Sequence, residues 1–118
     1  MRRSHEPPLW LLFGAGGLLA ALLAPALILL TGVVMPVAAE HGIEVLDYHA
    51  SRELLARPVV GVPVALALGL VLCHAAHRIY HTLRDLGIPA GRGTWWVCYG
   101  GAGVAGLLGV GAVVALWW

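Results

Sequence analysis

The 118-residue sequence predicts an all-α membrane protein with three transmembrane helices. Hydrophobic residues make up 60% of the chain and charged residues only 11%, with a mean hydropathy of +0.87. A soluble domain of this length cannot bury so much apolar surface. We expect one transmembrane domain over residues 1–118, with helices at about 9–35, 58–83 and 94–118. The net charge of +1 argues against a nucleic-acid partner, since phosphate binding needs a concentrated basic surface.

The first apolar run follows a short polar arm and contains no Asp, Glu, Lys, Arg or His from Pro7 to Ala39. A cleaved signal peptide is the alternative, because Val37-Ala38-Ala39 resembles a cleavage site. The run is far longer than the hydrophobic core of a signal peptide, about 7–15 residues, and exceeds the roughly 20 that span a bilayer. We therefore expect a membrane helix that Pro25 bends and that ends near Pro36.

Two further apolar runs follow, separated by polar segments. Residues 40–57 form the only long polar stretch, in which we expect a short surface helix. The second run starts at Pro58 and merges into a histidine-rich segment, residues 73–88. Glycine and proline between residues 87 and 93 predict a loop, after which the third run, residues 94–118, carries no charge.

The arginines predict the orientation, because loops on the cytoplasmic side of a membrane are enriched in Lys and Arg. The first loop has four acids against two arginines, whereas the N-terminal arm and the second loop carry Arg2, Arg3, Arg78, Arg84 and Arg92. We therefore expect the N-terminus and the histidine-rich segment on the cytoplasmic side of the membrane, and the C-terminus on the outer side.

Small residues recur every four positions on two predicted helices, a spacing that lets membrane helices approach closely. They are Gly16, Ala20 and Ala24 on the first helix, and Gly101, Ala105 and Gly109 on the third. This pattern predicts internal packing and a partner subunit. Cys73 and Cys98 form no CxxC motif, so we expect two buried small hydrophobic side chains rather than a disulfide.

The histidine-rich segment gathers ionisable side chains where a membrane helix meets water. At 100° per residue, these side chains share about a third of the helix circumference: His74, His77, Arg78, His81 and Asp85. Ionisable residues at bilayer depth usually face a protein interior or a wet cavity, which makes them functional candidates. The alternative is a solvated helix end whose arginines reach toward lipid headgroups.

Three functional classes fit this stripe. Haem ligation by two histidines needs facing helices, and the first and third runs contain no histidine, so a partner would supply the second ligand. A transporter or assembly element would more often carry polar residues at the midplane, where this chain is aliphatic. Quinone binding needs hydrogen-bond donors, a group that passes protons and an aromatic or small-residue wall. The candidates are Trp10, Phe13, Gly14, His77, Arg78 and His81, with Gly16 and Gly17 beside them.

Three motifs cover most of the chain outside the first loop. The first is Ser4-His-Glu-Pro-Pro-Leu-Trp-Leu-Leu-Phe-Gly-Ala-Gly-Gly, continuing through Ala24-Pro25. The second is His77-Arg78 followed by His81 and Asp85-Leu86, and the third is the Gly91–Gly100 segment with Trp-Val-x-Tyr-Gly. Together they resemble the family formed by the D subunit of fumarate reductase.

The resemblance implies a bacterial respiratory complex of four subunits in the inner membrane. The flavoprotein subunit carries FAD, the iron–sulfur subunit carries the clusters, and the C and D subunits are membrane anchors. In this haem-free family, menaquinol is oxidised near the cytoplasmic face, beside the last iron–sulfur cluster. We therefore expect a non-catalytic anchor of quinol:fumarate reductase that attaches the flavoprotein and iron–sulfur subunits to the membrane and helps to form the menaquinol site for anaerobic respiration. A haem-bearing anchor of succinate dehydrogenase is the alternative.

By matching motif positions, the resemblance places six residues around menaquinone: Trp10, Phe13, Gly14, His77, Arg78 and His81. The sequence departs from the family at Tyr80, where members often carry another histidine, and at Cys73 and His74. These departures leave open which side chain passes protons. Because no acid lies at membrane depth in this chain, a glutamate for proton uptake is expected in the other membrane anchor, the C subunit.

Overall fold

The structure, a computed structural model, describes the backbone of residues 6–118 and the side chains from Trp10 onward. Its elements are α1 (Glu6–Leu29), η1 (Leu30–Val34), α2 (Met35–Glu40), α3 (Tyr48–Ala56), α4 (Pro58–Asp85), α5 (Arg92–Trp95), η2 (Trp96–Gly100) and α6 (Gly101–Ala115), where η marks a π-helix. Three helical runs are long and apolar enough to cross a membrane: Trp10–Glu40, Pro58–Asp85 and Arg92–Ala115. The predicted all-α class with three candidate spans is confirmed for the described part of the chain. Arg2 and Arg3 lie outside the described residues.

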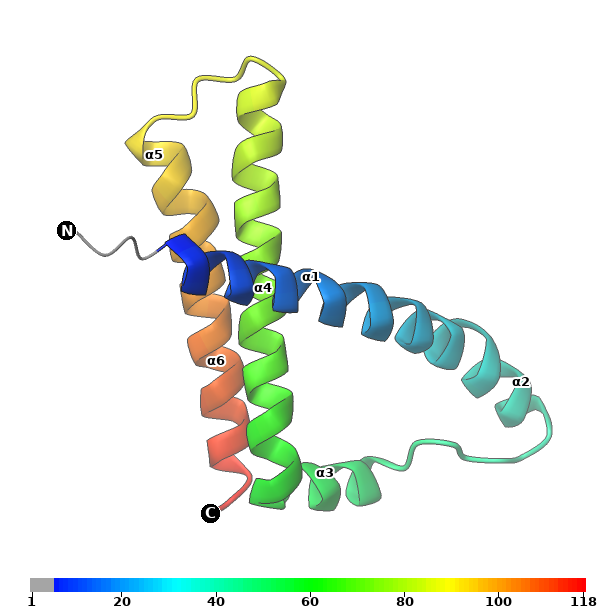
Figure 1. Ribbon diagram of the computed structural model, residues 1–118. Coiled ribbons are helices and arrows are strands. Elements are labelled where there is room, and N and C mark those ends of the chain that lie inside the picture. The colour runs from blue at the N-terminus through cyan, green and yellow to red at the C-terminus, as the bar shows by residue number, and fades with distance from the viewer. Residues whose placement is uncertain (1–5) are drawn as a thin grey trace.

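The second and third runs form an antiparallel pair, and the first run crosses it (Figure 1). Helices α4 and α6 lie side by side along most of their length, and α5 and η2 continue α6 beyond the crossing. The N-terminal half of α1 packs against α4, after which η1 and α2 extend away from the pair. A loop and α3 then lead back to the start of α4.

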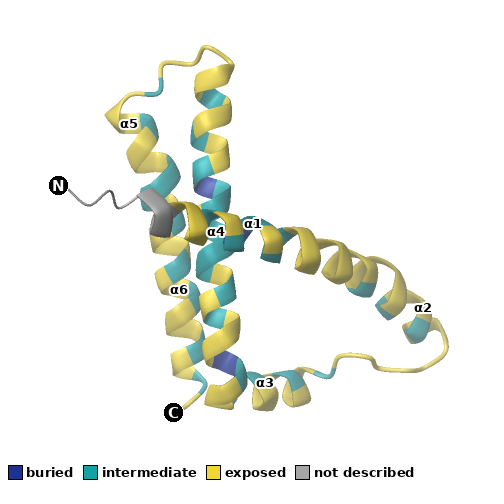
Figure 2. Cartoon of the chain, in the orientation of Figure 1, coloured by how far each residue is buried: buried dark blue, intermediate teal, exposed yellow. Residues whose placement is uncertain are grey.

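Little of the described chain is buried, as Figure 2 shows. Among the residues whose burial is described, only Gly16, Gly61 and Ala76 are buried, and the two glycines lie where another helix approaches closely. Large apolar side chains such as Leu22 and Ile28 are exposed along α1. Apolar surface on this scale marks a region that contacts lipid or another protein.

The first helical run continues through Pro36 to Glu40, so the prediction that it ends near Pro36 is wrong. The wide turn η1 comes directly before α2, which makes Pro36 a residue of the first turn of α2. The backbone is helical on both sides of this point, and the N–H of Met35 donates to the carbonyl of Leu30 five residues back, so Pro36 lies inside a continuous run directly after the wide turn. A proline disturbs a regular helix through the carbonyl four residues before it, and a wide turn changes the hydrogen bonding at that place. The run ends at Gly42, whose φ of +70° is favourable for glycine, and Ile43 N–H donates to the Ala38 carbonyl at 2.9 Å.

The second run ends in the same way. Gly87 has a φ of +75°, and the N–H of Ile88 donates to the carbonyl of Leu83 at 3.0 Å. The loop that was predicted from residue 87 onward therefore begins just after the end of α4. The short surface helix is also present as α3, and the Asp47 side chain caps it by accepting from Ala50 N–H at 2.9 Å.

The third run is displaced from its predicted bounds of 94–118. It begins at Arg92 and ends at Ala115, after which the amide of Leu116 turns back to the carbonyl of Val113 at 3.1 Å. Within it, η2 inserts one wide turn at Trp96–Gly100. This turn was not predicted, because no residue type marks a π-helix in a glycine-rich apolar run.

The predicted small-residue contacts are confirmed at one position on each helix. A Cβ built on Gly109 would lie 2.5 Å from Leu68 Cδ2, so this glycine brings α6 close to α4. Gly16 does the same between α1 and α4. By contrast, a Cβ on Gly101 meets nothing within 4 Å, and Ala24 and Ala105 are exposed. Those outward positions are available to lipid or to a partner subunit.

Candidate functional site

The site is built at the crossing of α1 and α4, where two glycines allow a histidine to approach the first helix. A Cβ on Gly17 would lie 2.6 Å from His74 Cε1, and one on Gly16 would meet the backbone carbonyl of Leu70. His74 Nδ1 lies 3.0 Å from the carbonyl oxygen of Phe13. Because a carbonyl oxygen only accepts, this hydrogen bond requires the proton on Nδ1 and joins the two helices.

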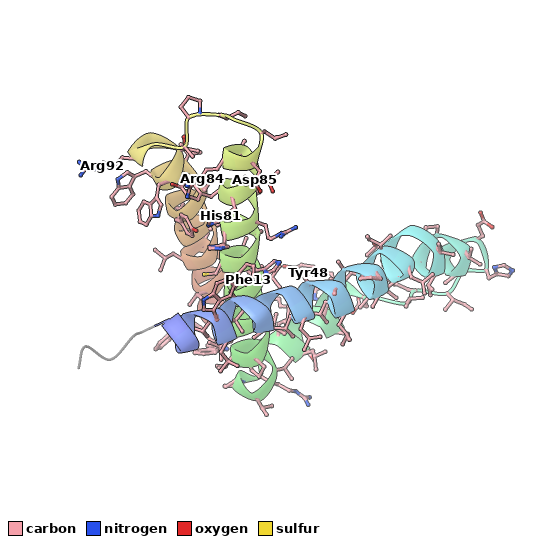
Figure 3. The ribbon with its side chains drawn as sticks, turned by 45° about the horizontal axis from the view of Figure 1, so that its top comes forward. Phe13, Tyr48, His81, Arg84, Asp85 and Arg92 are labelled. Atoms are coloured by element: carbon pink, nitrogen blue, oxygen red, sulfur yellow. The ribbon has the colours of Figure 1, made fainter. Side chains whose placement is uncertain are left out.

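A cluster of aromatic rings covers the same crossing. The Phe13 ring stacks on His74, with centroids 4.4 Å apart and planes at 23°, and lies 4.7 Å from His77. Trp10 meets the edge of Phe13 at 6.0 Å and is 66% exposed. Figure 3 shows Phe13 on α1 beside the histidine-bearing part of α4, with His81 further along that helix. This part of α1 thus places two aromatic side chains next to the histidines of α4.

The third helical run joins the cluster through Tyr99. Its hydroxyl oxygen lies 2.9 Å from Nδ1 of His77, and its ring lies 5.2 Å from Trp95 and 5.8 Å from Tyr80. Tyr80 in turn donates to the carbonyl oxygen of Ala90 at 3.2 Å. Tyr99 was not among the predicted site residues, although it is the only hydroxyl-bearing aromatic residue of the third run.

The remaining predicted site residues lie more openly. His81 is exposed, with its ring centroid 4.3 Å from that of His77, and Arg78 is exposed on the same helix. A Cβ on Gly14 would meet nothing within 4 Å, so the chain itself gives no reason for a glycine there. The structure therefore brings Trp10, Phe13, His77 and His81 into one series of ring contacts, with Arg78 beside it and Gly14 facing open space.

The length of α4 explains why polar residues gather at this end. Its 28 residues extend about 42 Å at roughly 1.5 Å per residue, which exceeds the hydrocarbon thickness of about 30 Å. Its last turns can therefore reach the polar interface, where donors and cations are less costly than at the midplane. Figure 3 shows His81, Arg84 and Asp85 on these last turns.

Neither cysteine belongs to the ring cluster, and the described residues form no group of metal ligands there. Cys73 and Cys98 are both free, and Cys73 is exposed while Cys98 is half-buried, so the prediction that both are buried is wrong. Cys73 lies outside the helix contacts because His74 and His77 occupy the face that meets α1 and η2. Within the described residues, no three His, Cys, Asp or Glu side chains come close enough to hold a metal ion.

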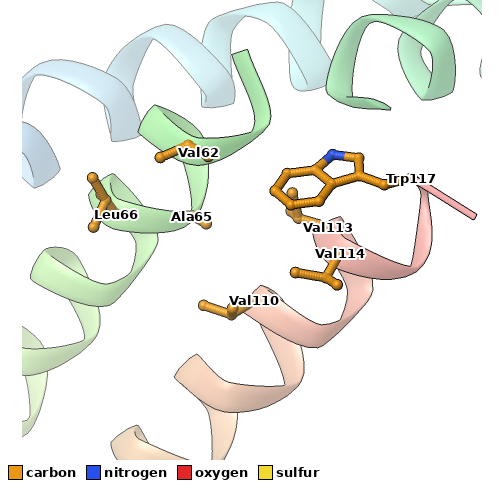
Figure 4. Close-up of a pocket in the computed structure, with 7 residues that line it drawn as sticks. All are labelled: Val62, Ala65, Leu66, Val110, Val113, Val114 and Trp117. Carbon is orange, nitrogen blue, oxygen red and sulfur yellow. The ribbon is translucent and has the colours of Figure 1, made fainter. Parts of the chain in front are cut away.

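The opposite end of the helix pair has a hollow of a different kind (Figure 4). Its volume is about 180 Å³, and it is lined by Val62, Ala65, Leu66, Val110, Val113, Val114 and Trp117. Ligand pockets are typically larger, at about 300–1,000 Å³, and present several convergent polar groups. The indole N–H of Trp117 is the only polar side-chain group among these seven residues, so the ring cluster is the better candidate site.

The helices and the ring cluster define a small multi-pass membrane protein whose polar groups gather at one end of a helix pair. The family model for the D subunit of fumarate reductase matches residues 1–115. The fumarate reductase D subunit of Shewanella sp. (strain W3-18-1) is 37% identical over 117 residues, covering 98% of this chain and 94% of that protein. The corresponding protein of Mycobacterium tuberculosis (strain H37Rv) is 39% identical over 104 residues, covering 84% and 78%.

The chain belongs to the family of fumarate reductase D subunits. The resemblance seen in the sequence motifs is thereby confirmed, and the chain is a membrane anchor in a complex with other fumarate reductase subunits. The family also implies partner subunits that carry FAD and iron–sulfur clusters.

Proposed function

We propose that this anchor completes a menaquinol-binding site in quinol:fumarate reductase and, together with the second membrane anchor, attaches the flavoprotein and iron–sulfur subunits to the membrane. The observation that carries the proposal is the continuous ring cluster, in which Phe13 lies 4.4 Å from His74 and 4.7 Å from His77. It combines flat apolar surface with imidazole nitrogens at one depth, which is what a quinone ring and its oxygens require.

Each residue has a distinct task in this proposal. Trp10 and Phe13 supply aromatic surface, while His77 and His81 offer ring nitrogens to the two oxygens of the ligand. Arg78 offers guanidinium N–H groups from the exposed side of α4, and hydrogen bonds with a charged partner are the stronger ones. Gly14 leaves room on α1 for a ligand or a partner side chain to approach. Menaquinone, when bound, supplies the two-electron, two-proton chemistry.

The exposure of the cluster supports a shared pocket. A quinone-sized ligand is mostly buried when bound, yet Trp10 is 66% exposed and His81 lies on open surface. The missing walls would come from the iron–sulfur subunit and the second membrane anchor, which is consistent with the unburied apolar surface of all three helical runs. The arginine distribution favours a position of this end of α4 at the cytoplasmic face of the bacterial inner membrane, where the iron–sulfur subunit would dock.

The test is purification through a tag on this chain. Covalently bound flavin and the iron–sulfur electron paramagnetic resonance signal should copurify, and the preparation should reduce fumarate with menaquinol. Cells that lack this chain should keep fumarate reduction by a reduced dye in the soluble fraction but lose the menaquinol-linked reaction. A chain that purifies without flavin and iron–sulfur proteins would contradict the proposal and favour an assembly or transport role.

A further inference from the structure

Tyr99 makes the one side-chain hydrogen bond between the second and third helical runs in the described part of the chain. Its hydroxyl oxygen lies 2.9 Å from Nδ1 of His77, and both residues are partly buried. The two side chains come from positions 22 apart in the sequence, so the bond is tertiary rather than local. A partly buried polar pair of this kind fixes the orientation of both rings.

The wide turn η2 is what brings Tyr99 to this position. It spans Trp96–Gly100, and such single π-turns change the direction in which the following side chains point and often occur at functional sites. Trp95 packs on the Tyr99 ring at 5.2 Å with planes at 32°, and Tyr80 packs at 5.8 Å. Neighbouring rings therefore restrict Tyr99, and its hydroxyl is presented to a single nitrogen.

The two histidines of the crossing are thereby given different roles. His74 donates from Nδ1 to the carbonyl of Phe13, and its ring lies against Gly17 of α1. His77 instead meets a hydroxyl, which donates to Nδ1 when the imidazole carries its proton on Nε2. Among the described residues, Nε2 of His77 has no hydrogen-bond partner. The hydrogen bond at one ring nitrogen thus determines what the other nitrogen can offer a ligand.

We propose that Tyr99 is a positioning residue of the menaquinol site: its hydroxyl donates to Nδ1 of His77, so that the Nε2–H of His77 is held toward a ring oxygen of the bound quinol. The inference rests on the proposed function, because it assumes that His77 contacts the quinol. Tyr99 itself makes no contact with the ligand. Its effect passes through the tautomer and the orientation of His77.

The variant Tyr99→Phe in the intact complex tests this role. We expect the KM for menadiol, used as a soluble quinol, to rise by about three- to tenfold, with kcat within about twofold, because a bond made equally in the ground and transition states affects KM. Dye-linked fumarate reduction should not change. The matched control is Tyr80→Phe, which removes a hydroxyl bonded only to the carbonyl of Ala90 and should leave the KM unchanged.

A double-mutant cycle separates positioning from packing. In a His77→Ala background, Tyr99→Phe should raise the KM no further, because the imidazole that Tyr99 orients is gone. An equal rise in both backgrounds, or a joint fall of menadiol-linked and dye-linked activity, would overturn the proposal. If His77→Ala raises the KM and Tyr99→Phe does not, only the role of Tyr99 fails. If His77→Ala itself leaves the KM unchanged, the proposed quinol site fails and the role of Tyr99 with it.

Discussion

The substitution Gly16→Ala tests the helix crossing on which the site depends. The added Cβ would meet the carbonyl oxygen of Leu70 and lie 2.9 Å from His74 Cβ. Neither atom can rotate away, since one belongs to the backbone of α4 and the other is the first atom of its side chain. The helices must therefore separate. Overpacking of this kind costs about 1–3 kcal/mol, and alanine recovers about 0.5–1 kcal/mol of helix propensity, so we expect a net loss of up to about 2.5 kcal/mol.

The assay is the midpoint of denaturant-induced unfolding of the purified complex in mixed micelles. The matched control is Gly32→Ala, because a Cβ there meets nothing within 4 Å and the residue lies on the same helical run. Gly32→Ala should be neutral or slightly stabilising, whereas Gly16→Ala should lower the midpoint and the menaquinol-linked activity, since Phe13 is displaced from His74. If the two variants unfold alike, α1 does not cross α4 at Gly16 in the assembled complex, and the reasoning is refuted.

Two further predictions concern topology and haem. With the arginine-rich side in the cytoplasm, an impermeant thiol reagent added from outside should label a cysteine placed at Glu44 but not one placed at Gly91. The reverse labelling pattern would put the ring cluster on the outer face of the membrane and contradict the proposed site. The dithionite-reduced complex should show no b-type haem band from this subunit, because the first and third apolar runs contain no histidine that could serve as a second axial ligand. A band that disappears on mutation of His74, His77 or His81 would contradict that expectation.

The fold class could be predicted because composition and run length determine it. A chain that is 60% hydrophobic, with three runs long enough to span a bilayer, has few alternatives to membrane helices. The helix ends were harder to predict. Gly87 marked one end correctly, but Pro36 was assigned as an end and instead lies in the first turn of α2. A proline is compatible with either role, and the wide turn η1 that decides between them leaves no signature in residue type.

The candidate site was predicted in part. Helical periodicity places His77 and His81 on one face, and their rings do lie 4.3 Å apart. Periodicity within one helix cannot reveal partners on another, however. The bond from His74 to Phe13 depends on the close approach at Gly17, and the bond from His77 to Tyr99 depends on η2. Both are tertiary features, so no spacing along a single apolar run would have predicted them.

The most direct test of the central claim is the ratio of menaquinol-linked to dye-linked fumarate reduction in membranes carrying Arg78→Ala or His77→Ala. A reduced dye passes electrons to the soluble subunits without the quinol site. The loss of the charged Arg78 hydrogen bond, about 1.5–3 kcal/mol, should lower the ratio roughly tenfold to a hundredfold. The loss of the neutral His77 bond, about 0.5–1.5 kcal/mol, should lower it roughly two- to tenfold. The matched control, His49→Ala, removes an exposed histidine of α3 and should leave the ratio unchanged. If both activities fall together, these residues hold the complex on the membrane. If neither activity falls, they form a solvated helix end. Either result would contradict the claim that they bind menaquinol.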